Sequence, residues 1–333
     1  MKKSILTLFT LMLCCMACKN KSSLPQAPAK DTETKMSEVA FNADSAYQYV
    51  VRQCDFGPRT PGSDAHKQCG DYIASVFKSF GLEVQEQTAT LTNWDGVPYT
   101  CRNLIASHLP EADRRILLCA HWDCRPWCDA DADPANHRKP VMGANDGASG
   151  VAVMMELARQ IGKISPNTGI DFICFDLEDY GAPYWAEDKA PYDGSDWCLG
   201  SRYWATNPHK ENYTASFGIL LDMVGGEHTQ FRYEGYSLQY ARDIVVKVWQ
   251  TSSNLGYDNY FRATDGGWAT DDHVPINEYA GIPTIDIIPH VEDENSSFGP
   301  TWHTVNDTPE HISRQTLKAV GQTLVQVLHE QNQ

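Results

Sequence analysis

Short apolar runs that alternate with helix-like stretches constrain the fold of this chain most. The runs Ile170 to Phe175 and Gly218 to Val224 are almost continuously apolar, as expected of strands that are buried on both faces. Amphipathic stretches lie between such runs, including one that predicts a helix over 238–255, and the last of them covers 312–331. Strands that alternate with helices favour a parallel sheet covered by helices. We therefore expect one α/β domain of three layers (αβα), with a mostly parallel central sheet flanked by helices.

The size and the charge of the chain limit its possible domain number and its possible partners. The chain has 333 residues, of which 42% are hydrophobic, as is typical of a globular protein. Removal of a short leader leaves about 300 residues, enough for one large α/β domain. The formal net charge of −16 offers no basic face to phosphate, so we expect no nucleic-acid partner.

The first residues are typical of an export signal. Lys2 and Lys3 precede an apolar stretch over 5–16, which is short for a membrane span, and Ala17 comes directly before Cys18. A small residue followed by cysteine resembles a bacterial lipoprotein processing site. Residues 1–18 are therefore expected to be a lipoprotein-type signal peptide, with Cys18 as the lipidated residue. An ordinary cleaved signal peptide is the alternative.

The next segment predicts where the mature chain resides. Residues 19–40 begin with a stretch rich in Lys, Ser, Pro, Ala and Thr, which is typical of a flexible tether. Residues 41–333 would form the folded domain. We expect a monomer at the periplasmic face of a membrane, attached only through the lipid on Cys18.

Three of the eleven cysteines lie in the leader. The other eight are Cys54, Cys69, Cys101, Cys119, Cys124, Cys128, Cys174 and Cys198. An even number in an exported chain permits disulfides, but the pairing cannot be deduced from the sequence. No CxxC pair occurs among Cys119, Cys124 and Cys128, so we expect bridges or buried thiols there rather than thiolate zinc binding.

Several acidic residues and histidines follow the apolar runs, while Asp146 opens a helix-like stretch and His303 lies beyond the loop after the last expected strand. They are His121 and Asp123 in LLCAHWD, Asp146 in GANDGASG, Glu178 and Asp179 in FDLEDYG, Asp222 in LLDMVGG, and His303 in TWHT. In an α/β protein such positions converge on one edge of the sheet. Imidazole and carboxylate groups gathered there are the ligands of hydrolase-type zinc sites. The sequence therefore predicts a metal site at this edge.

Asp146 has a structural explanation as well as a functional one. An aspartate directly before a helix-like stretch is most often an N-cap. Gly143, Gly147 and Gly150 surround it, however, and glycines would let a metal or a substrate approach the backbone closely. We therefore expect Asp146 to be a metal ligand.

Glu178 and Asp179 are the most specific signal. Adjacent carboxylates at a strand end face different ways, so one can bind a metal while its neighbour transfers protons, and a cation relieves their repulsion. A solvated acidic loop is the alternative, which the apolar run 172–175 disfavours. A lone histidine is more often structural than a ligand. His303 would nevertheless complete a three-ligand set with Asp146 and Asp179 and leave one position open, as in catalytic zinc sites.

The remaining candidates are polar and aromatic residues in loops. Asp222 could orient a proton carrier or bind a second metal, whereas Asp271 lies in TDDHVPI, for which a turn is the simpler explanation. The aromatic residues Trp302, Trp185 and Phe298 could wall a small pocket, although core packing is the default for any single aromatic residue.

These motifs, in this order, resemble the M28 zinc aminopeptidase fold family. Within it they look most like the animal-type glutaminyl cyclases and their bacterial relatives. The resemblance begins near Ala43 and runs through FGPRTPGS, AHWD, GANDGASG, FDLEDYG, LGSRYWA, LLDMVGG, TDDHVPI and TWHT. FGPRTPGS, DDHVPI and WHT favour a cyclase over an aminopeptidase. The catalytic domain would thus be residues 41–333.

The resemblance implies one zinc ion per chain, with Asp146, Asp179 and His303 as its ligands. His121 occupies the position of a second-metal ligand in the di-zinc peptidases, and the cyclases keep this histidine but use one zinc.

The resemblance also assigns roles to the other candidates. The general acid/base would be Glu178, in an acidic hydrogen-bond network with Asp222 and Asp271. Trp302 would hold the substrate, and Phe298 and Trp185 would line the pocket.

Two positions depart from the family pattern. The family usually has Glu-Glu where this chain has Glu178 and Asp179. Aspartate is a competent zinc ligand but one methylene shorter, so the metal or the strand end must shift to meet it. Ala120 stands where the animal enzymes carry a disulfide cysteine, and the adjacent Cys119 would point the opposite way on a strand.

The expected activity is zinc-dependent conversion of the N-terminal glutamine of peptides or proteins to pyroglutamate, with release of ammonia. One alternative is an M28 aminopeptidase that hydrolyses N-terminal residues, because His121 and Asp222 could help to hold a second metal. Another is a noncatalytic binding module with the same fold. That alternative predicts loss of the site residues, whereas all of them are present.

Overall fold

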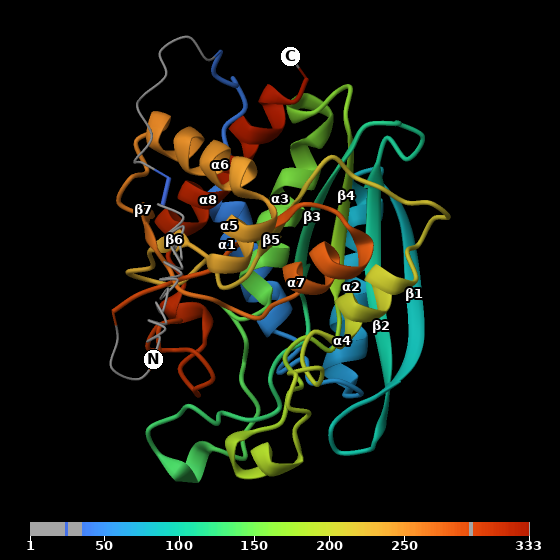
Figure 1. Ribbon diagram of the computed structural model, residues 1–333, viewed down its shortest axis with the longest axis vertical. Helices are drawn as coiled ribbons and strands as arrows, with labels where there is room; N and C mark the ends of the chain where they lie inside the picture. The colour runs from blue at the N-terminus through green and yellow to red at the C-terminus, as the bar shows by residue number, and fades with distance from the viewer. Residues whose placement is uncertain (1–23, 26–34, 293–295, 333) are drawn as a thin grey trace, which may run out of the picture.

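A six-stranded sheet forms the centre of the molecule (Figure 1). Its strands are β1 (Glu83–Thr92), β2 (Pro98–His108), β3 (Arg115–His121), β4 (Gly169–Phe175), β5 (Gly218–Leu221) and β8 (Thr284–Ile287). They lie in the order β1-β2-β4-β3-β5-β8. The neighbours from β4 to β8 pair in parallel, whereas β1 with β2 and β2 with β4 pair antiparallel. The expected mostly parallel sheet is confirmed.

This computed structural model describes residues 24–25, 35–292 and 296–332. The expected signal peptide and Cys18 lie outside the described residues. Within the segment expected to be a tether, the amide of Ser37 donates to Gln326, and just beyond it the buried Phe41 donates to Gln322. In the described part of the chain, no helix is both long and apolar enough to cross a membrane.

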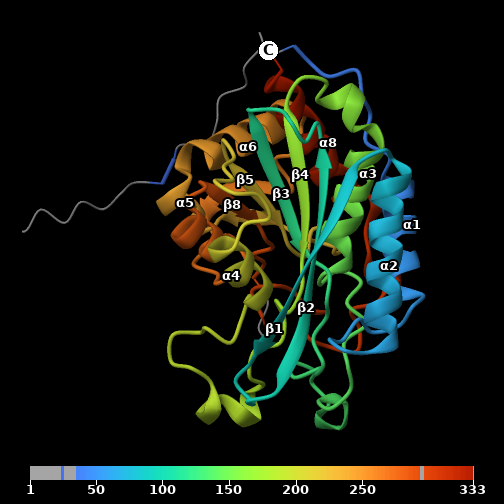
Figure 2. The ribbon, with the colours of Figure 1, turned by 90° about the vertical axis from the view of Figure 1, so that its right-hand side faces the viewer.

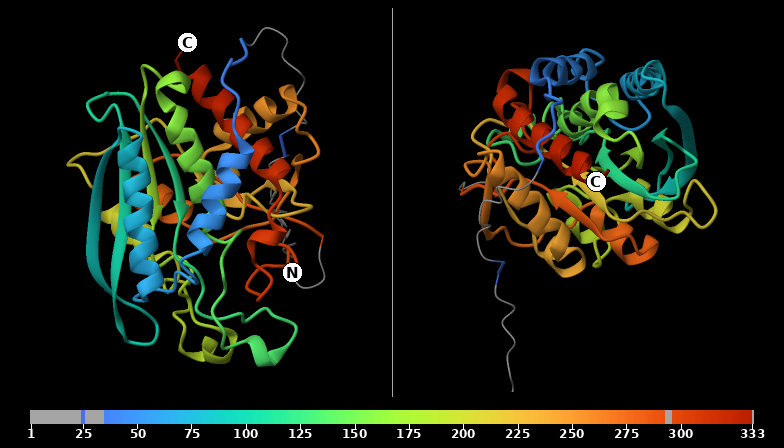
Figure 3. Two further views of the ribbon diagram at one scale, coloured as in Figure 1. Left: turned by 180° about the vertical axis from the view of Figure 1, so that it is seen from behind. Right: turned by 90° about the horizontal axis from the view of Figure 1, so that it is seen from above.

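Helices cover both faces of the sheet (Figures 2 and 3). They are α1 (Ala43–Cys54), α2 (Asp64–Ser79), α3 (Ala148–Ile164), α4 (Leu199–Thr206), α5 (Gly235–Tyr240), α6 (Arg242–Asn254), α7 (His273–Pro275) and α8 (Arg314–Glu330). Helices α1, α2, α3, α6 and α8 share a large apolar core with Leu118 and Ile219. Helix α4 packs through Trp204 on the opposite face, against Leu117 and Leu220. Because adjacent strand residues face opposite layers, the three-layer αβα arrangement follows.

The structure differs from the sequence expectations at the periphery. The helix expected over 238–255 is broken at Ala241, whose φ of −142° and ψ of 40° separate α5 from α6. Two short strands, β6 (Phe231–Tyr233) and β7 (Phe261–Asp265), form a second small sheet. The sequence does not predict these two strands, because they are too short to show the alternation of apolar and polar residues. The remaining elements are η1 (Pro134–Asn136), η2 (Tyr184–Lys189), η3 (Ile276–Ala280) and η4 (Pro309–His311).

The glycines beside Asp146 allow close packing of α3 rather than the approach of a ligand. A Cβ added at Gly150 would lie 2.2 Å from the carbonyl oxygen of Leu221 and 2.8 Å from Cβ of Ala120. A Cβ at Gly147 would lie 2.8 Å from Cε1 of His121. Helix α3 therefore sits directly on β3 and β5 only because these positions lack side chains.

Replacing Gly150 by alanine is expected to lower the free energy of unfolding by about 3 kcal/mol, the upper end for overpacking, because the backbone of β5 cannot yield. Gly162→Ala is the matched control in the same helix, where an added Cβ meets nothing within 4 Å. That change is expected to stabilise the protein by roughly 0.5–1 kcal/mol. Urea unfolding measures both, and equal effects of the two changes would contradict this account of α3.

The eight cysteines within the described residues are all free and buried. Of the two alternatives, buried thiols are therefore confirmed over bridges.

Candidate active site

Asp146, Asp179 and His303 come together at the carboxyl edge of the sheet. Asp146 precedes α3, Asp179 follows β4, and His303 lies in the loop after β8. All three are buried, and one ligand atom from each lies within 4.8 Å of the others. His303 Nε2 is 3.1 Å from Asp179 Oδ1 and 3.6 Å from Asp146 Oδ2. The N-cap of α3 is Gly147, without a side-chain cap, so Asp146 is directed to this cluster rather than to capping.

The cluster fits a divalent cation. Both carboxylate oxygens of Asp179 are buried and lack a hydrogen-bond partner among the described residues, although His303 Nε2 lies near one of them. Burial raises the pKa of Asp179, and the charge of Asp146 raises that pKa further. A cation bound between these groups would offset both penalties. The donor set of two carboxylates and one imidazole is that of a catalytic metal site.

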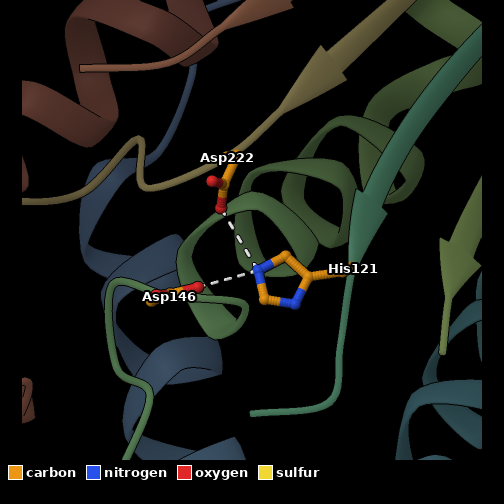
Figure 4. A group of neighbouring side chains, drawn as sticks. All are labelled: His121, Asp146 and Asp222. Carbon is orange, nitrogen blue, oxygen red and sulfur yellow. Dashed lines mark hydrogen bonds and ion pairs between the residues drawn. The ribbon is translucent and has the colours of Figure 1, made fainter. Parts of the chain in front are cut away.

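His121 lies in a second cluster, which shares Asp146 with the first (Figure 4). Its Nε2 is 2.9 Å from Asp146 Oδ1 and 3.2 Å from Asp222 Oδ1. Burial acts to lower the pKa of His121, but the neighbouring carboxylates of Asp123, Asp146 and Asp222 outweigh burial and raise the pKa well above its ordinary value. In the metal-free protein these carboxylates therefore favour the protonated imidazole.

Glu178 is held by groups on neighbouring elements. Its backbone N–H and that of Asp179 donate to the two oxygens of Asp123, at 3.2 and 3.4 Å. The thiol of Cys198 donates to Glu178 Oε1 at 3.4 Å, and the backbone N–H of Cys198 donates to the carbonyl of Glu178 at 3.0 Å. These bonds fix the turn after β4, so the two adjacent carboxylates face different partners.

Four residues next to the site have left-handed backbone without being glycine. They are Leu177 (φ 57°), Cys198 (φ 58°), Met223 (φ 50°) and His303 (φ 52°). Leu177 precedes Glu178 and Met223 follows Asp222. Such conformations concentrate at functional sites, where the surrounding structure enforces them.

The carboxyl groups behind the first cluster form a buried acidic group. Glu178, Cys198 and Asp271 bring their side-chain atoms within 4.8 Å of one another. Burial raises the pKa of Glu178 well above its usual range. Burial and the charge of Asp222 raise the pKa of Asp271 to about 7, and burial raises that of Asp222 to about 6. Carboxyl groups that hold protons near neutral pH are suited to proton transfer.

These pKa values predict how the metal-free protein responds to pH. In the folded protein the pKa is raised to about 7 for the carboxyl of Asp271 and to about 6 for that of Asp222. A carboxyl of this kind stabilises the fold fully below its unfolded pKa of about 3.9, and this stabilisation is lost as the pH rises through the folded pKa. The raised pKa of His121 acts in the same direction. The Tm of chelator-treated protein is therefore expected to fall between about pH 4 and 7.

Zinc should flatten that pH dependence, because a bound cation favours the charged carboxylates. Differential scanning fluorimetry with and without zinc measures it. A Tm of the metal-free protein that rises with pH over this interval would contradict the protonation states given above.

A cavity of about 240 Å³ opens onto the metal-ligand candidates, and aromatic side chains form part of its wall. Trp302 stacks on His303 at 3.8 Å between ring centroids, and Phe298 lies 5.3 Å from Trp302. Trp197 and Trp268 complete the aromatic wall. A larger cavity of about 530 Å³ lies beyond Phe298 but is not lined by Glu178 or by the metal-ligand candidates. The smaller cavity is therefore the candidate substrate pocket.

Trp185 does not line this pocket, and the expectation that it would is corrected. Its ring lies edge-on to Trp127 at 6.2 Å, and the guanidinium of Arg138 lies 3.9 Å from its centroid. Trp185 thus lies where two long loop segments, the excursions 122–140 and 183–197, contact each other below the sheet in Figure 1. The end of the second excursion, Trp197, reaches the pocket instead.

The comparisons with known proteins agree with this site. The model of peptidase family M28 matches residues 103–328, which include every residue of the two clusters. This chain belongs to peptidase family M28.

Two solved structures from Bacteroides thetaiotaomicron resemble this M28 protein along most of its length. One is a glutaminyl cyclase bound to N-acetylhistamine, 50% identical, with a TM-score of 0.84 over 87% of this chain and 98% of that chain. The other is described as a leucine aminopeptidase precursor, 49% identical, with a TM-score of 0.84 over 89% and 99%. The fold of this M28 chain is therefore that of both, while their names point to different reactions.

More distant curated relatives likewise include both an aminopeptidase and a glutaminyl-peptide cyclotransferase. Aminopeptidase YwaD of Bacillus subtilis (strain 168) is 27% identical over 88% of this chain, which spans only 59% of that protein. The glutaminyl-peptide cyclotransferase of Bos taurus is 26% identical over 80% of this chain and 76% of its own length.

Proposed function

We propose that this M28 protein is a zinc-dependent glutaminyl-peptide cyclotransferase, which converts the N-terminal glutamine of peptides or proteins to pyroglutamate and releases ammonia. The observation that carries the proposal is the buried Glu178 carboxyl beside a three-ligand cluster, at the floor of a small aromatic pocket. The likeness to the Bacteroides thetaiotaomicron glutaminyl cyclase and to the bovine enzyme supports it.

One zinc ion per chain would be held by Asp146, Asp179 and His303. When bound, zinc supplies Lewis acidity that polarises the γ-carbonyl of the substrate glutamine. The three ligand candidates all lie in the lining of the pocket in which the substrate would bind.

Glu178 would transfer the proton. In the cyclisation, the α-amine forms a bond to the side-chain amide carbon (Cδ) of the glutamine, and the bond from Cδ to the side-chain nitrogen breaks. Glu178 would take a proton from the amine and return it to the leaving nitrogen, which departs as ammonia. Asp222 and Asp271 would help to set the balance between the protonated and the charged form of Glu178, because all three groups belong to one buried acidic network.

The aromatic wall suits a reaction in which water is not a reactant. Trp302, held against His303, would pack on the substrate glutamine, and Phe298 and Trp197 would restrict the space around it. Exclusion of water favours attack by the amine over hydrolysis and strengthens the electrostatic contacts of Glu178.

An M28 aminopeptidase is the second candidate, and the cluster of His121, Asp146 and Asp222 favours it because it could hold a second metal. The likeness to the glutaminyl cyclases favours the cyclase proposal over this second candidate.

The test is mass spectrometry with ammonia detection on a peptide that begins with glutamine. The expected result is a product lighter by one ammonia, lost on treatment with a chelator and restored by zinc. Release of the free N-terminal residue would refute the cyclase proposal and establish the aminopeptidase. Unchanged peptide in the presence of zinc would refute both.

We also propose that the protein is exported and anchored to a membrane through a lipid on Cys18, on the basis of its N-terminal sequence. Cys18→Ser should move the full-length protein from the membrane fraction to the soluble fraction of the producing bacterium. An unchanged membrane association would refute the anchor.

A further inference from the structure

We propose that Arg125 and Asp129 form a positioning clamp for two of the metal-ligand candidates, His303 and Asp179, and that this clamp strengthens zinc binding. The inference rests on the ligand set of the proposed function. Both clamp residues lie in the excursion 122–140, in which the sequence analysis singles out only Asp123 as a site candidate.

The contacts of His303 separate the roles of its two ring nitrogens. Nε2 faces the metal-ligand candidates, 3.1 Å from Asp179 Oδ1, whereas Nδ1 lies 3.3 Å from Asp129 Oδ1. A hydrogen bond from Nδ1–H to Asp129 would leave the lone pair of Nε2 free for a metal. Carboxylates that accept from the second nitrogen of a metal-binding histidine fix its tautomer and the orientation of its ring.

Asp129 is itself held by Arg125. The guanidinium donates through Nε to Asp129 Oδ1 at 2.7 Å and through Nη2 to Oδ2 at 2.5 Å. Their side chains are 2% and 9% exposed, respectively. A bidentate pair in this setting has little rotational freedom, so the carboxylate of Asp129 cannot turn away from His303.

The same guanidinium reaches the second ligand candidate. Arg125 Nη1 donates to the backbone carbonyls of Asp179 and Gly181, both at 3.2 Å, and lies 3.6 Å from Asp179 Oδ1. The guanidinium carbon of Arg125 also lies 4.7 Å from the ring centroid of Trp197. Aspartate is shorter than glutamate, so the position of its backbone limits where its carboxylate can reach. Arg125 fixes that backbone position.

Asp129 would also favour zinc binding through its negative charge. A bare guanidinium this close to the cluster would repel a cation, and Asp129 neutralises it. Loss of Asp129 therefore removes the acceptor for Nδ1 and also leaves a buried, unpaired positive charge beside the zinc site.

A neighbouring aspartate offers a matched control. Asp131 Oδ2 accepts the backbone N–H of Val305 at 3.0 Å, so Asp131 supports the loop that carries His303 without contacting its ring. If the excursion merely braced this loop, Asp131→Asn and Asp129→Asn would have similar effects on zinc binding.

The experiment compares zinc affinity by chelator competition for the full-length protein and its variants. Asp129→Ala is expected to weaken zinc binding by about 10–100-fold, the range for loss of such a partner. Asp129→Asn, which keeps an acceptor oxygen but not the charge, should fall between this variant and the wild type. Asp131→Asn should bind zinc nearly as tightly as the wild type, even if its Tm falls.

Proton NMR of the zinc-loaded protein gives a readout independent of affinity and of catalysis. The Nδ1–H signal of His303, assigned by its loss in His303→Ala, should be present in the wild type and in Asp131→Asn and absent in Asp129→Ala. Should Asp129→Ala not fold, Asp129→Asn and Arg125→Lys, which loses the bidentate geometry but keeps the charge, carry the test.

Wild-type zinc affinity in Asp129→Asn and Arg125→Lys would overturn the clamp, as would an equal loss in Asp131→Asn. Because the readout is zinc binding, a protein that binds zinc but forms no pyroglutamate would refute the proposed function alone. Absence of zinc binding by the wild type would refute both.

Discussion

Glu178→Gln is expected to lower kcat for cyclisation of a glutamine-initiated peptide by about 10²–10⁴-fold, the contribution typical of a positioned proton-transfer group. Glutamine keeps the size of the side chain and can still accept from the thiol of Cys198, but it cannot take up the proton of the α-amine. KM should change little, because the aromatic wall that would bind the substrate is left intact. Steady-state kinetics with zinc-saturated enzyme measure both constants.

The control for this prediction is the zinc content of the variant. Glu178 is not one of the three ligand candidates, so Glu178→Gln should bind as much zinc as the wild type. If activity falls only in proportion to lost zinc, the role of Glu178 is structural. A kcat within a few-fold of the wild type would exclude Glu178 as the proton-transferring group.

Asp146→Ala is expected to abolish both zinc binding and activity, because Asp146 belongs to both clusters at the carboxyl edge. The effect on zinc affinity should exceed the roughly 10–100-fold loss that removal of an outer partner produces. Metal analysis after dialysis, together with the peptide assay, measures both consequences.

His121→Ala separates one metal from two. With one zinc bound by Asp146, Asp179 and His303, this variant should still contain one zinc per chain, because His121 contacts that set only through Asp146. In a two-metal aminopeptidase, the wild type would contain two zinc ions and His121→Ala one. That outcome would contradict the proposed stoichiometry and favour hydrolysis.

The central elements could be predicted from the sequence because their patterns are long and repetitive. The strands β3 and β4 are continuous apolar runs that are buried on both faces, and α3 and α8 each carry an apolar stripe. Asp146 and Asp179 lie beside such elements, one before α3 and the other after β4. Once parallel pairing is inferred, both are expected at the same edge of the sheet, since the carboxyl ends of parallel strands share one edge with the starts of the helices that follow them.

The excursions could not be predicted in the same way. The contacts of Arg125, Asp129 and Trp197 join segments with no period, and only the folded chain shows which of several tryptophans reaches the pocket. The sequence therefore placed Trp185 in the pocket lining, where the structure has Trp197. Nor does a sequence reveal the left-handed backbone at Leu177, because nothing distinguishes a leucine that adopts it from one that does not.

The four left-handed residues at the site have a consequence for engineering this protein. Each stores about 1 kcal/mol or more of conformational energy that the rest of the fold must supply. Asparagine or glycine at Leu177 or Met223 would relieve that energy, and selection for thermal tolerance alone would favour such changes. The relaxed turns would then hold Glu178 and Asp222 less firmly, so heat resistance and turnover are expected to be in conflict at these positions.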